Sequence, residues 1–333
     1  MEKNEGMGAP ALKSIAVFTS GGDAPGMNAA IRAVVRTALQ HQLDIYGIYG
    51  GYQGMIQGSL ERLSSTCMAN IIQRGGTILK TGRSREFMTP AGRQKAAENL
   101  RQAGIQALIC IGGDGSFAGA YAMWEEHGIR FIGIPGTIDN DIYGTDQTIG
   151  FDTAINTALR AIDQIRDTAA SHNRLFIVEV MGRDSGFIAL EVGIAGGAEE
   201  VFVPEYPTSV DQTVEHIKSG IARGKMSNIL ITAEGQKPGR AYDLAEAIRS
   251  RTGFEAKVCI LGHVQRGGAP TAADRILASR MGYAAVKGLL AGENAAMTAM
   301  QKSELVFFPL KQSVGHRKIP SQSLMDLLRT LAL

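Results

Sequence analysis

Short apolar runs alternate with amphipathic segments along nearly the whole 333-residue chain. The runs predict buried strands, and the segments between them have helical spacing, as at Ile155, Leu159 and Ile162. Regular alternation of strands and helices predicts mainly parallel sheets that are covered by helices on both faces. The strands are too many for one sheet of this kind, so we expect two α/β domains with a boundary near Gly150.

The position of the motifs relative to these elements limits where a ligand could bind. In open α/β sheets, ligands lie beyond the carboxyl ends of the strands. The glycine-rich turns and the acidic segment discussed below each follow a predicted strand. The predicted strands are 14–19, 43–49, 107–111, 131–134, 175–180, 200–203, 229–233, 256–261 and 305–308. One helix is predicted to follow the first glycine-rich turn and to end near residue 40. The other predicted helices span 90–103, 116–127, 151–167, 210–223, 242–251, 271–290 and 321–331.

The charge balance and the cysteines exclude several classes of protein. A formal net charge of +2 gives no global field for nucleic acid or a membrane surface. Cys67, Cys110 and Cys259 are far apart, which predicts reduced structural thiols, with the last two in buried strands. Residues 1–10 lack the pattern of a signal peptide, and no run approaches the roughly 18 apolar residues of a membrane span. We expect a cytoplasmic location.

The stretch after the run 131–134 carries a hydroxyl and two carboxylates at alternate positions, Thr137, Asp139 and Asp141. In extended backbone these side chains would project to the same side. Carboxylates beyond the end of a buried strand can hold a metal or take a proton from a hydroxyl. A solvated loop is the alternative, and entry from a buried strand through Pro-Gly argues against it.

Two glycine-rich turns join a strand to a helix. The first contains Gly21-Gly22-Asp23, and the second is Gly112-Gly113-Asp114-Gly115-Ser116. Glycines let backbone amides approach a phosphate at a helix N-terminus. A tight turn, or Asp114 acting only as a helix cap, is the alternative. Neither turn has the GxGxxG or GxxxxGK[ST] spacing. Asp114 and Asp139 could divide metal binding and proton acceptance between them.

Basic side chains also follow or flank the predicted strands. They are Arg83, Arg174, Arg183, His263 and Arg266. A single arginine is usually a surface charge, but several at strand ends predict a site for a polyanion, because guanidinium binds phosphate with two hydrogen bonds.

Five motifs occur in the order found in bacterial ATP-dependent 6-phosphofructokinases, the phosphofructokinase A family, which the chain resembles from about 14 to about 292. The motifs are Thr19–Ala29, Ile111–Ser116, Pro135–Asp141, Met181–Arg183 and Leu261–Gly268. The resemblance implies two Rossmann-like three-layer α/β/α domains with the active site in the cleft between them. The implied nucleotide-binding domain is 14–150 plus about 265–313. The implied sugar-phosphate-binding domain is 151–264 plus about 314–333.

The activity implied by the resemblance is a step of glycolysis. It is phosphoryl transfer from MgATP to the 1-hydroxyl of fructose 6-phosphate, giving fructose 1,6-bisphosphate and ADP. Mg²⁺ would be the metal cofactor and ATP the co-substrate. The family also implies an allosteric enzyme and a homotetramer in which a neighbouring subunit completes the site.

The resemblance assigns roles by position. Asp139 would be the general base, Thr137 and Asp141 its neighbours, Asp114 the Mg²⁺ ligand, and Arg183 the group that stabilises the transferring phosphoryl. The implied nucleotide site is Gly21, Gly22, Arg83, Ser84, Gly112, Gly113, Asp114, Gly115 and Ser116. The implied sugar-phosphate site is Thr137, Asp139, Arg174, Met181, Gly182, Arg183, Glu234, Lys257, His263 and Arg266, with Arg174 reaching in from a neighbouring subunit.

Two positions depart from the family pattern. Lys257 stands where a second arginine from the neighbouring subunit is usual, and lysine keeps the charge but loses the two-pronged geometry. We therefore expect weaker sugar-phosphate binding. Ser84 stands where some members carry an aromatic residue near adenine.

Three rival functions are less favoured. A pyrophosphate-dependent phosphofructokinase tends to carry bulkier residues where this chain has Gly115 and Gly136, so these glycines favour ATP. An NAD-dependent oxidoreductase would need the missing GxGxxG. A non-catalytic sugar-phosphate sensor would not need both Asp114 and Asp139.

The family has an effector site for ADP or phosphoenolpyruvate at another subunit interface. The residues that fit it are Arg32, Arg36, Arg166, Glu199, Arg223 and Lys225. Ser59 and Met226 stand where cations are common, so we hypothesise reduced or absent regulation by these effectors. Saturation curves with and without each effector test this hypothesis, and strong effects from both would contradict it.

Overall fold

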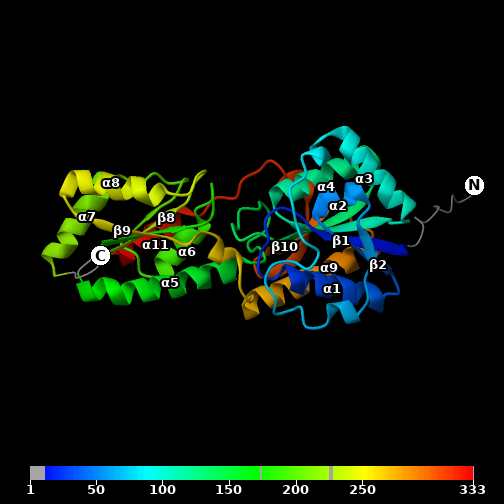
Figure 1. Ribbon diagram of the computed structural model, residues 1–333, viewed down its shortest axis with the longest axis horizontal. Coiled ribbons are helices and arrows are strands. Elements are labelled where there is room, and N and C mark those ends of the chain that lie inside the picture. The colour runs from blue at the N-terminus through cyan, green and yellow to red at the C-terminus, as the bar shows by residue number, and fades with distance from the viewer. Residues whose placement is uncertain (1–11, 173–174, 225–227, 333) are drawn as a thin grey trace, which may run out of the picture.

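The computed structural model describes residues 12–172, 175–224 and 228–332. These residues form two lobes, each built on its own sheet (Figure 1). The larger lobe has seven described strands in the order β11-β10-β5-β4-β1-β2-β3, and the smaller lobe has four in the order β7-β8-β6-β9.

The larger sheet is parallel in its centre and antiparallel at both edges, where β3 pairs with β2 and β11 with β10. Helices α1 and α9 cover one face, and α2, α3 and α4 cover the other (Figure 1). The strands are β1 (Ser14–Thr19), β2 (Asp44–Ile48), β3 (Leu60–Arg62), β4 (Ala107–Gly112), β5 (Arg130–Pro135), β10 (Ala296–Gln301) and β11 (Glu304–Pro309). The helices are α1 (Met27–Gln40), α2 (Gly51–Gln57), α3 (Pro90–Gln102), α4 (Asp114–His127), α9 (Ala272–Ala291) and α10 (Leu310–Ser313), with short 3-10 turns η1 (Thr66–Met68) and η2 (Glu86–Met88).

The smaller sheet is parallel throughout its described strands. Helices α5, α6 and α11 pack on one face, while α7 and α8 pack on the other. The strands are β6 (Leu175–Val180), β7 (Glu200–Phe202), β8 (Asn228–Ala233) and β9 (Ala256–Ile260). The helices are α5 (Phe151–His172), α6 (Phe187–Ala195), α7 (Val210–Ala222), α8 (Arg240–Thr252) and α11 (Gln322–Leu331), and the 3-10 turn η3 (Gly262–Arg266) follows β9.

The predicted two-sheet α/β class is confirmed, and so is nearly every predicted element. One hydrophobic core runs from the larger lobe into the smaller one through Ile138, Ile149 and Phe151, and the Phe151 and Phe187 rings meet edge to face at 6.5 Å. The predicted boundary near Gly150 falls at the start of α5 and stays a prediction.

Five of the described helices and strands were not predicted, namely α2, β3, α6, β10 and α10. For α6 and β10 the physical reason is clear. Helix α6 is apolar almost all round, so it has no amphipathic period to detect. Strand β10 reads AMTAMQ, and neither alanine nor methionine favours a strand, so only its pairing with β5 and β11 defines it.

The expectation of a buried strand was wrong for Cys259, which is only half-buried because β9 is the edge strand of the smaller sheet. Cys67, for which no burial was predicted, is exposed in η1. Cys110 is buried as expected.

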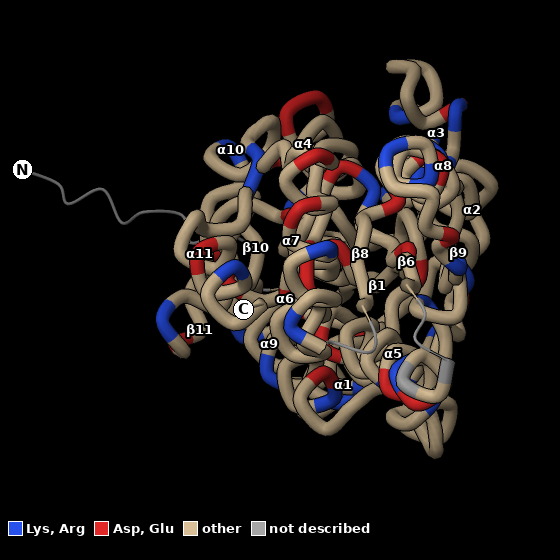
Figure 2. The backbone as a smooth tube through the Cα atoms, turned by 90° about the vertical axis from the view of Figure 1, so that its left-hand side faces the viewer, with Lys and Arg blue, Asp and Glu red and all other residues tan. Residues whose placement is uncertain are grey.

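The surface agrees with the near-neutral composition. Figure 2 shows basic and acidic residues interspersed on α5, α7 and α8 of the smaller lobe. None of the helices in the described chain is long and apolar enough to cross a membrane.

Candidate active site

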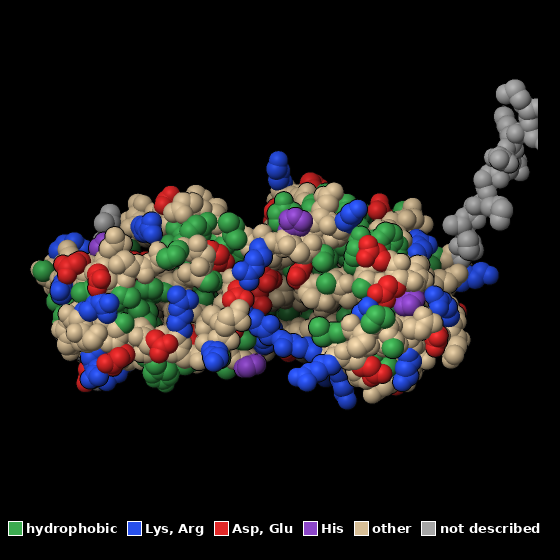
Figure 3. Space-filling view, turned by 90° about the horizontal axis from the view of Figure 1, so that it is seen from above, with side chains coloured by type: hydrophobic (Ala, Val, Ile, Leu, Met, Phe, Trp, Pro, Cys, Tyr) green, Lys and Arg blue, Asp and Glu red, His purple; other side chains and the backbone are tan. Residues whose placement is uncertain are grey.

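A cavity of about 630 Å³ lies at the carboxyl ends of β1, β4 and β5. Acidic and basic side chains gather where the two lobes meet (Figure 3). The cavity brings together segments that are far apart in the sequence. The predicted site residues that line it are Gly21, Gly22, Arg83, Ser84, Gly113, Asp114, Gly115, Ser116, Thr137, Asp139, Asp141, Arg183 and Arg266.

The two glycine-rich turns lie against each other. The Ser20 amide donates to the Ile111 carbonyl at 3.0 Å. A Cβ on Gly112 would lie 2.7 Å from both the Ser116 Oγ and the Ser20 carbonyl, so only glycine allows this approach. Gly113 is the N-cap residue of α4, which leaves the Asp114 side chain as part of the cavity wall rather than the cap. The N-terminus of α4 therefore offers partial positive charge to an anion.

The acidic segment is a turn, so the expectation of an extended backbone was wrong. Asn140 has a left-handed φ of 51°, which breaks the alternation between Asp139 and Asp141. The Thr137 Oγ accepts from the Asp139 amide at 3.2 Å, and the Ser185 Oγ donates to the Asp139 carbonyl at 2.8 Å. The turn still brings all three predicted side chains to the cavity.

Asp139 is a buried carboxylate in an unfavourable electrostatic environment. Its Oδ1 has no hydrogen-bond partner among the described residues. Burial raises the pKa of Asp139 to about 6, the Asp141 charge adds to this, and Arg266 and Arg183 oppose it. A carboxyl group with a free acceptor atom and a pKa below neutrality is suited to accept a proton at pH 7.

Asp114 and Asp141 form a second pair of mutually unfavourable charges. Partial desolvation, and then the Asp141 charge, raise the pKa of Asp114. Burial raises the pKa of Asp141, with Arg317 and Lys318 among the groups that oppose it. Two such carboxylates fit a divalent cation. No described cluster of three or more His, Cys, Asp or Glu side chains could hold a metal ion, so further ligands would be water or phosphate oxygens, as is usual for Mg²⁺.

Arg183 and Arg266, two of the four described arginines that line the cavity, lower the pKa of Asp139 and are held in place in different ways. Arg183 has a φ of 52° and follows Gly182, whose φ is 139°. Arg266 reaches across from η3 to the first glycine turn, where its Nη1 donates to the Asp23 carbonyl at 3.1 Å. A Cβ on Gly22 would lie 2.6 Å from this Nη1, so the glycine makes room for the guanidinium.

Six predicted residues of the described chain lie outside the cavity lining: Gly112, Met181, Gly182, Glu234, Lys257 and His263. Glu234 is buried beside the cavity, since its pKa is raised by burial and lowered by the Arg183 amide and the Arg266 charge. Lys257 is exposed on β9 and lies 3.4 Å from Glu255, and His263 is exposed on η3. Arg174 lies outside the described residues.

An apolar wall of the cavity was not predicted. Its members come from α2, η2 and the middle of α4, and no single motif marks them. They are Tyr52, Phe87, Met88, Ala118, Gly119 and Ala122. The Tyr52 and Phe87 rings stack with centroids 3.9 Å apart. A flat apolar surface beside phosphate-accessible turns is suited to a nucleobase.

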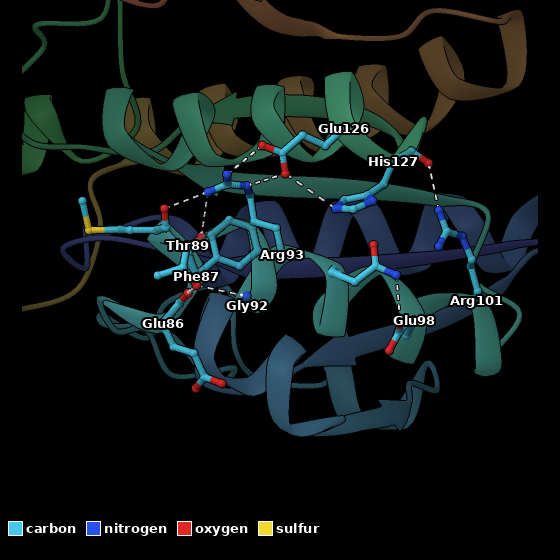
Figure 4. Close-up of polar contacts among 11 residues, drawn as sticks. Glu86, Phe87, Thr89, Gly92, Arg93, Glu98, Arg101, Glu126 and His127 are labelled. Carbon is cyan, nitrogen blue, oxygen red and sulfur yellow. Dashed lines mark hydrogen bonds and ion pairs between the residues drawn. The ribbon is translucent and has the colours of Figure 1, made fainter.

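Arg93 holds this wall in place and was also missed. Its Nη1 donates to the carbonyls of Phe87 and Met88 at 3.1 and 2.9 Å (Figure 4). Its Nε and Nη2 bind both carboxylate oxygens of Glu126 on α4 at 2.6 and 2.7 Å. This two-pronged pair fixes η2 against α4. Ser84 adds a second tie, donating to Gln53 at 2.7 Å and accepting from the Phe87 amide at 3.1 Å.

The predicted effector residues divide between the lobes. Arg32 and Arg36 lie on α1 of the larger lobe. In the smaller lobe, Glu199 and Arg223 line a second cavity of about 100 Å³, and Arg166 donates to the Gly196 and Gly197 carbonyls. Lys225 and Met226 lie outside the described residues.

Turns that admit phosphate, beside a buried carboxylate whose Oδ1 lacks a partner among the described residues, indicate an α/β phosphotransferase. The chain belongs to the phosphofructokinase family, which it matches over residues 14–289.

Similar proteins include ATP-dependent 6-phosphofructokinase 1 of Thermus thermophilus, 57% identical over 322 residues, which are 97% of this chain and 100% of that protein. ATP-dependent 6-phosphofructokinase of Coxiella burnetii is 54% identical over 90% of this chain and 91% of its own length. Among solved structures, phosphofructokinase from Saccharomyces cerevisiae is similar with a TM-score of 0.84 and 36% identity, covering 90% of this chain and 44% of that one. Pyrophosphate-dependent phosphofructokinase from Marinobacter aquaeolei is similar with a TM-score of 0.82 and 25% identity, covering 96% of this chain and 92% of that one.

The buried charge of Asp139 predicts an effect on stability. Its pKa rises from 3.8 to about 6 on folding, so its stabilising contribution is complete below pH 3.8 and is lost as the pH rises through about 6. Asp139→Asn should therefore raise the free energy of unfolding at pH 8 by about 1–3 kcal/mol, and by about half as much at pH 5. Urea unfolding at both pH values measures this. Asp163→Asn on the exposed side of α5 is the control, and a destabilised Asp139→Asn at pH 8 would refute the prediction.

Proposed function

We propose that the chain transfers a phosphoryl group from MgATP to the 1-hydroxyl of fructose 6-phosphate, giving fructose 1,6-bisphosphate and ADP. The observation that carries the proposal is the unpartnered Oδ1 of buried Asp139, which lines the same cavity as both glycine turns. The names of the similar proteins support ATP as the donor and fructose 6-phosphate as the acceptor.

The larger lobe would bind the nucleotide. The turns at Gly21-Gly22 and Gly112–Ser116 and the N-terminus of α4 are suited to the phosphates. Arg83 supplies a further cation at the cavity. The wall that includes Tyr52 and Phe87 would receive the base, which accounts for a cavity that extends beyond the phosphate-binding turns.

Asp139 would take the proton of the attacking hydroxyl. With a pKa of about 6 it is ionised at neutral pH, and it is still basic enough to accept a proton as the oxygen attacks. Arg183 and Arg266 keep this carboxyl ionised, and Arg183 would also bind the phosphoryl group as its charge develops.

The residues present fit a magnesium site. Asp114 would hold Mg²⁺, with Asp141 beside it, because the two carboxylates are close enough for the Asp141 charge to raise the pKa of Asp114. A bound ion would supply positive charge that offsets the negative charge of the phosphate oxygens.

The smaller lobe would bind the sugar phosphate. Met181, Gly182 and Glu234 stand at the carboxyl ends of β6 and β8, next to Arg183. Lys257 and His263 are exposed in one chain, so a homotetramer in which a neighbouring subunit faces them, and contributes its own Arg174, would complete this side. The division into a nucleotide domain (14–150 and about 265–313) and a sugar-phosphate domain, the cytoplasmic location and the effector site belong to the same proposal.

The choice of donor rests on Gly115 more than on Gly136. A Cβ on Gly136 would point into the core, 3.0 Å from Ile111 Cγ2 and 3.3 Å from Met27 Cε, so this glycine is explained by packing. A Cβ on Gly115 would have no described atom within 4 Å, and Gly115 lines the cavity. A larger side chain at Gly115 would therefore occupy donor space.

The donor prediction follows from this geometry. With Mg²⁺ and fructose 6-phosphate, the wild type should form product with ATP and not with pyrophosphate in a coupled assay. Gly115→Asp should lower kcat/KM for ATP by on the order of tenfold or more, because a carboxylate would face the donor phosphates. Glu125→Gln, on the exposed side of the same helix, is the control. Efficient use of pyrophosphate by the wild type would show that ATP is not the specific phosphoryl donor.

The base prediction concerns turnover. Asp139→Asn should lower kcat on the order of 10³-fold or more while ATP binding is retained. The pH profile of kcat/KM for the wild type should fall on the acid side with an apparent pKa near 6, because protonated Asp139 cannot accept the proton. Asp163→Asn should leave both unchanged. Turnover of Asp139→Asn close to that of the wild type would show that another group is the base.

A further inference from the structure

Two helices from different lobes begin at the same place. Helix α5 starts ten residues after Asp141, and α9 starts six residues after Arg266. The first turn of each helix carries an acid, Asp152 in α5 and Asp274 in α9. Neither acid lines the cavity described above.

Asp274 caps the helix of the other lobe. Its Oδ1 accepts from the Gly150 amide at 2.8 Å, and its Oδ2 accepts from the Thr153 amide at 2.8 Å and the Thr153 Oγ at 2.5 Å. Asp274 is 1% exposed, so these bonds form away from bulk water. A carboxylate thereby satisfies free amides at the start of α5, although it belongs to a helix remote in sequence.

The start of α9 is tied back to α5 in return. Thr271, its N-cap residue, donates its amide to the Thr153 Oγ at 3.0 Å and its own Oγ to the Asp152 carboxylate at 2.5 Å. The Thr271 Oγ also accepts from the Asp274 amide at 3.3 Å. Each threonine hydroxyl both donates and accepts, so the network admits one relative position of the two helices.

The junction holds both substrate-facing segments. On one side, Asp274 binds Gly150, and the neighbouring Ile149 amide donates to the Pro135 carbonyl at 2.9 Å, which closes the segment that carries Asp139. On the other side, buried Gln265 accepts from the Met181 amide at 2.8 Å and donates to the Ala154 carbonyl at 3.4 Å. Arg266 is the next residue after Gln265.

We propose that Asp274 and Thr153 are positioning residues for phosphoryl transfer: their network fixes the Asp139 segment relative to Arg266 and Met181 across the two lobes. The inference rests on the proposed function. Displacement of a reacting group by about 1 Å costs on the order of 10²-fold in rate, so loosening the junction should lower turnover. The apolar wall and α4 lie outside the network, so ATP affinity should be independent of it.

The test compares three variants with the wild type and a control. Thr153→Val removes the hydroxyl, and Thr153→Ser keeps it. Asp274→Asn replaces an acceptor by an amide group that faces backbone donors. Ser209→Ala removes a helix cap of the same kind at α7. The measurements are kcat with saturating ATP and fructose 6-phosphate, the Kd of ATP without sugar, and the thermal unfolding midpoint.

Thr153→Val and Asp274→Asn should lower kcat by about 10- to 100-fold with the Kd of ATP within about twofold of the wild type. Thr153→Ser and Ser209→Ala should keep kcat within about twofold. If Asp274→Asn does not fold, the comparison of kcat between Thr153→Val and Thr153→Ser tests the inference. Unchanged kcat in folded Thr153→Val, or a loss of ATP affinity in proportion to kcat, would overturn the inference while the proposed function stands. A wild type without activity towards fructose 6-phosphate would overturn both.

Discussion

The accumulation of negative charge at one edge of the larger sheet is the constraint on which the rest of the structure depends. Asp114, Asp139 and Asp141 share one cavity, desolvation raises the pKa of each, and the Asp141 charge raises the pKa of Asp114 and Asp139 further. The larger lobe does not balance this charge alone, since Arg183 comes from the smaller lobe and Arg266 from the segment that returns from it. The fold therefore stabilises an arrangement of acids that neither sheet could hold by itself.

Small side chains make that arrangement possible. The two glycine turns approach so closely that a Cβ at Gly112 would meet neighbouring oxygens, and the guanidinium of Arg266 occupies the space above Gly22. Glycine thus serves two purposes here. At Gly22 and Gly112 it lets protein groups approach each other, whereas at Gly115 it leaves the cavity open.

The strand-helix alternation and the strand-end motifs could be predicted from the sequence, because the burial of a strand and the turn at its carboxyl end are local properties. Features that combine segments remote in sequence could not be predicted. The apolar wall takes Tyr52, Phe87 and Ala118 from three elements, and nothing local marks them. Helix α6 had no amphipathic period to detect, and the turn at Asn140 lies beside a hydrogen bond from the remote Ser185 to the Asp139 carbonyl. Roles such as base and metal ligand came from family resemblance and are still tied to the proposal.

The larger sheet takes two of its strands, β10 and β11, from residues 296–309, after the whole smaller lobe. During synthesis, the edge of β5 that pairs with β10 therefore stays unpaired until nearly the whole chain has been synthesised. The smaller sheet is drawn from one uninterrupted stretch and can form earlier. An interrupted chain would present the apolar edge of β5 to other chains, so premature termination near the C-terminus carries a risk of aggregation, beyond the loss of a few residues.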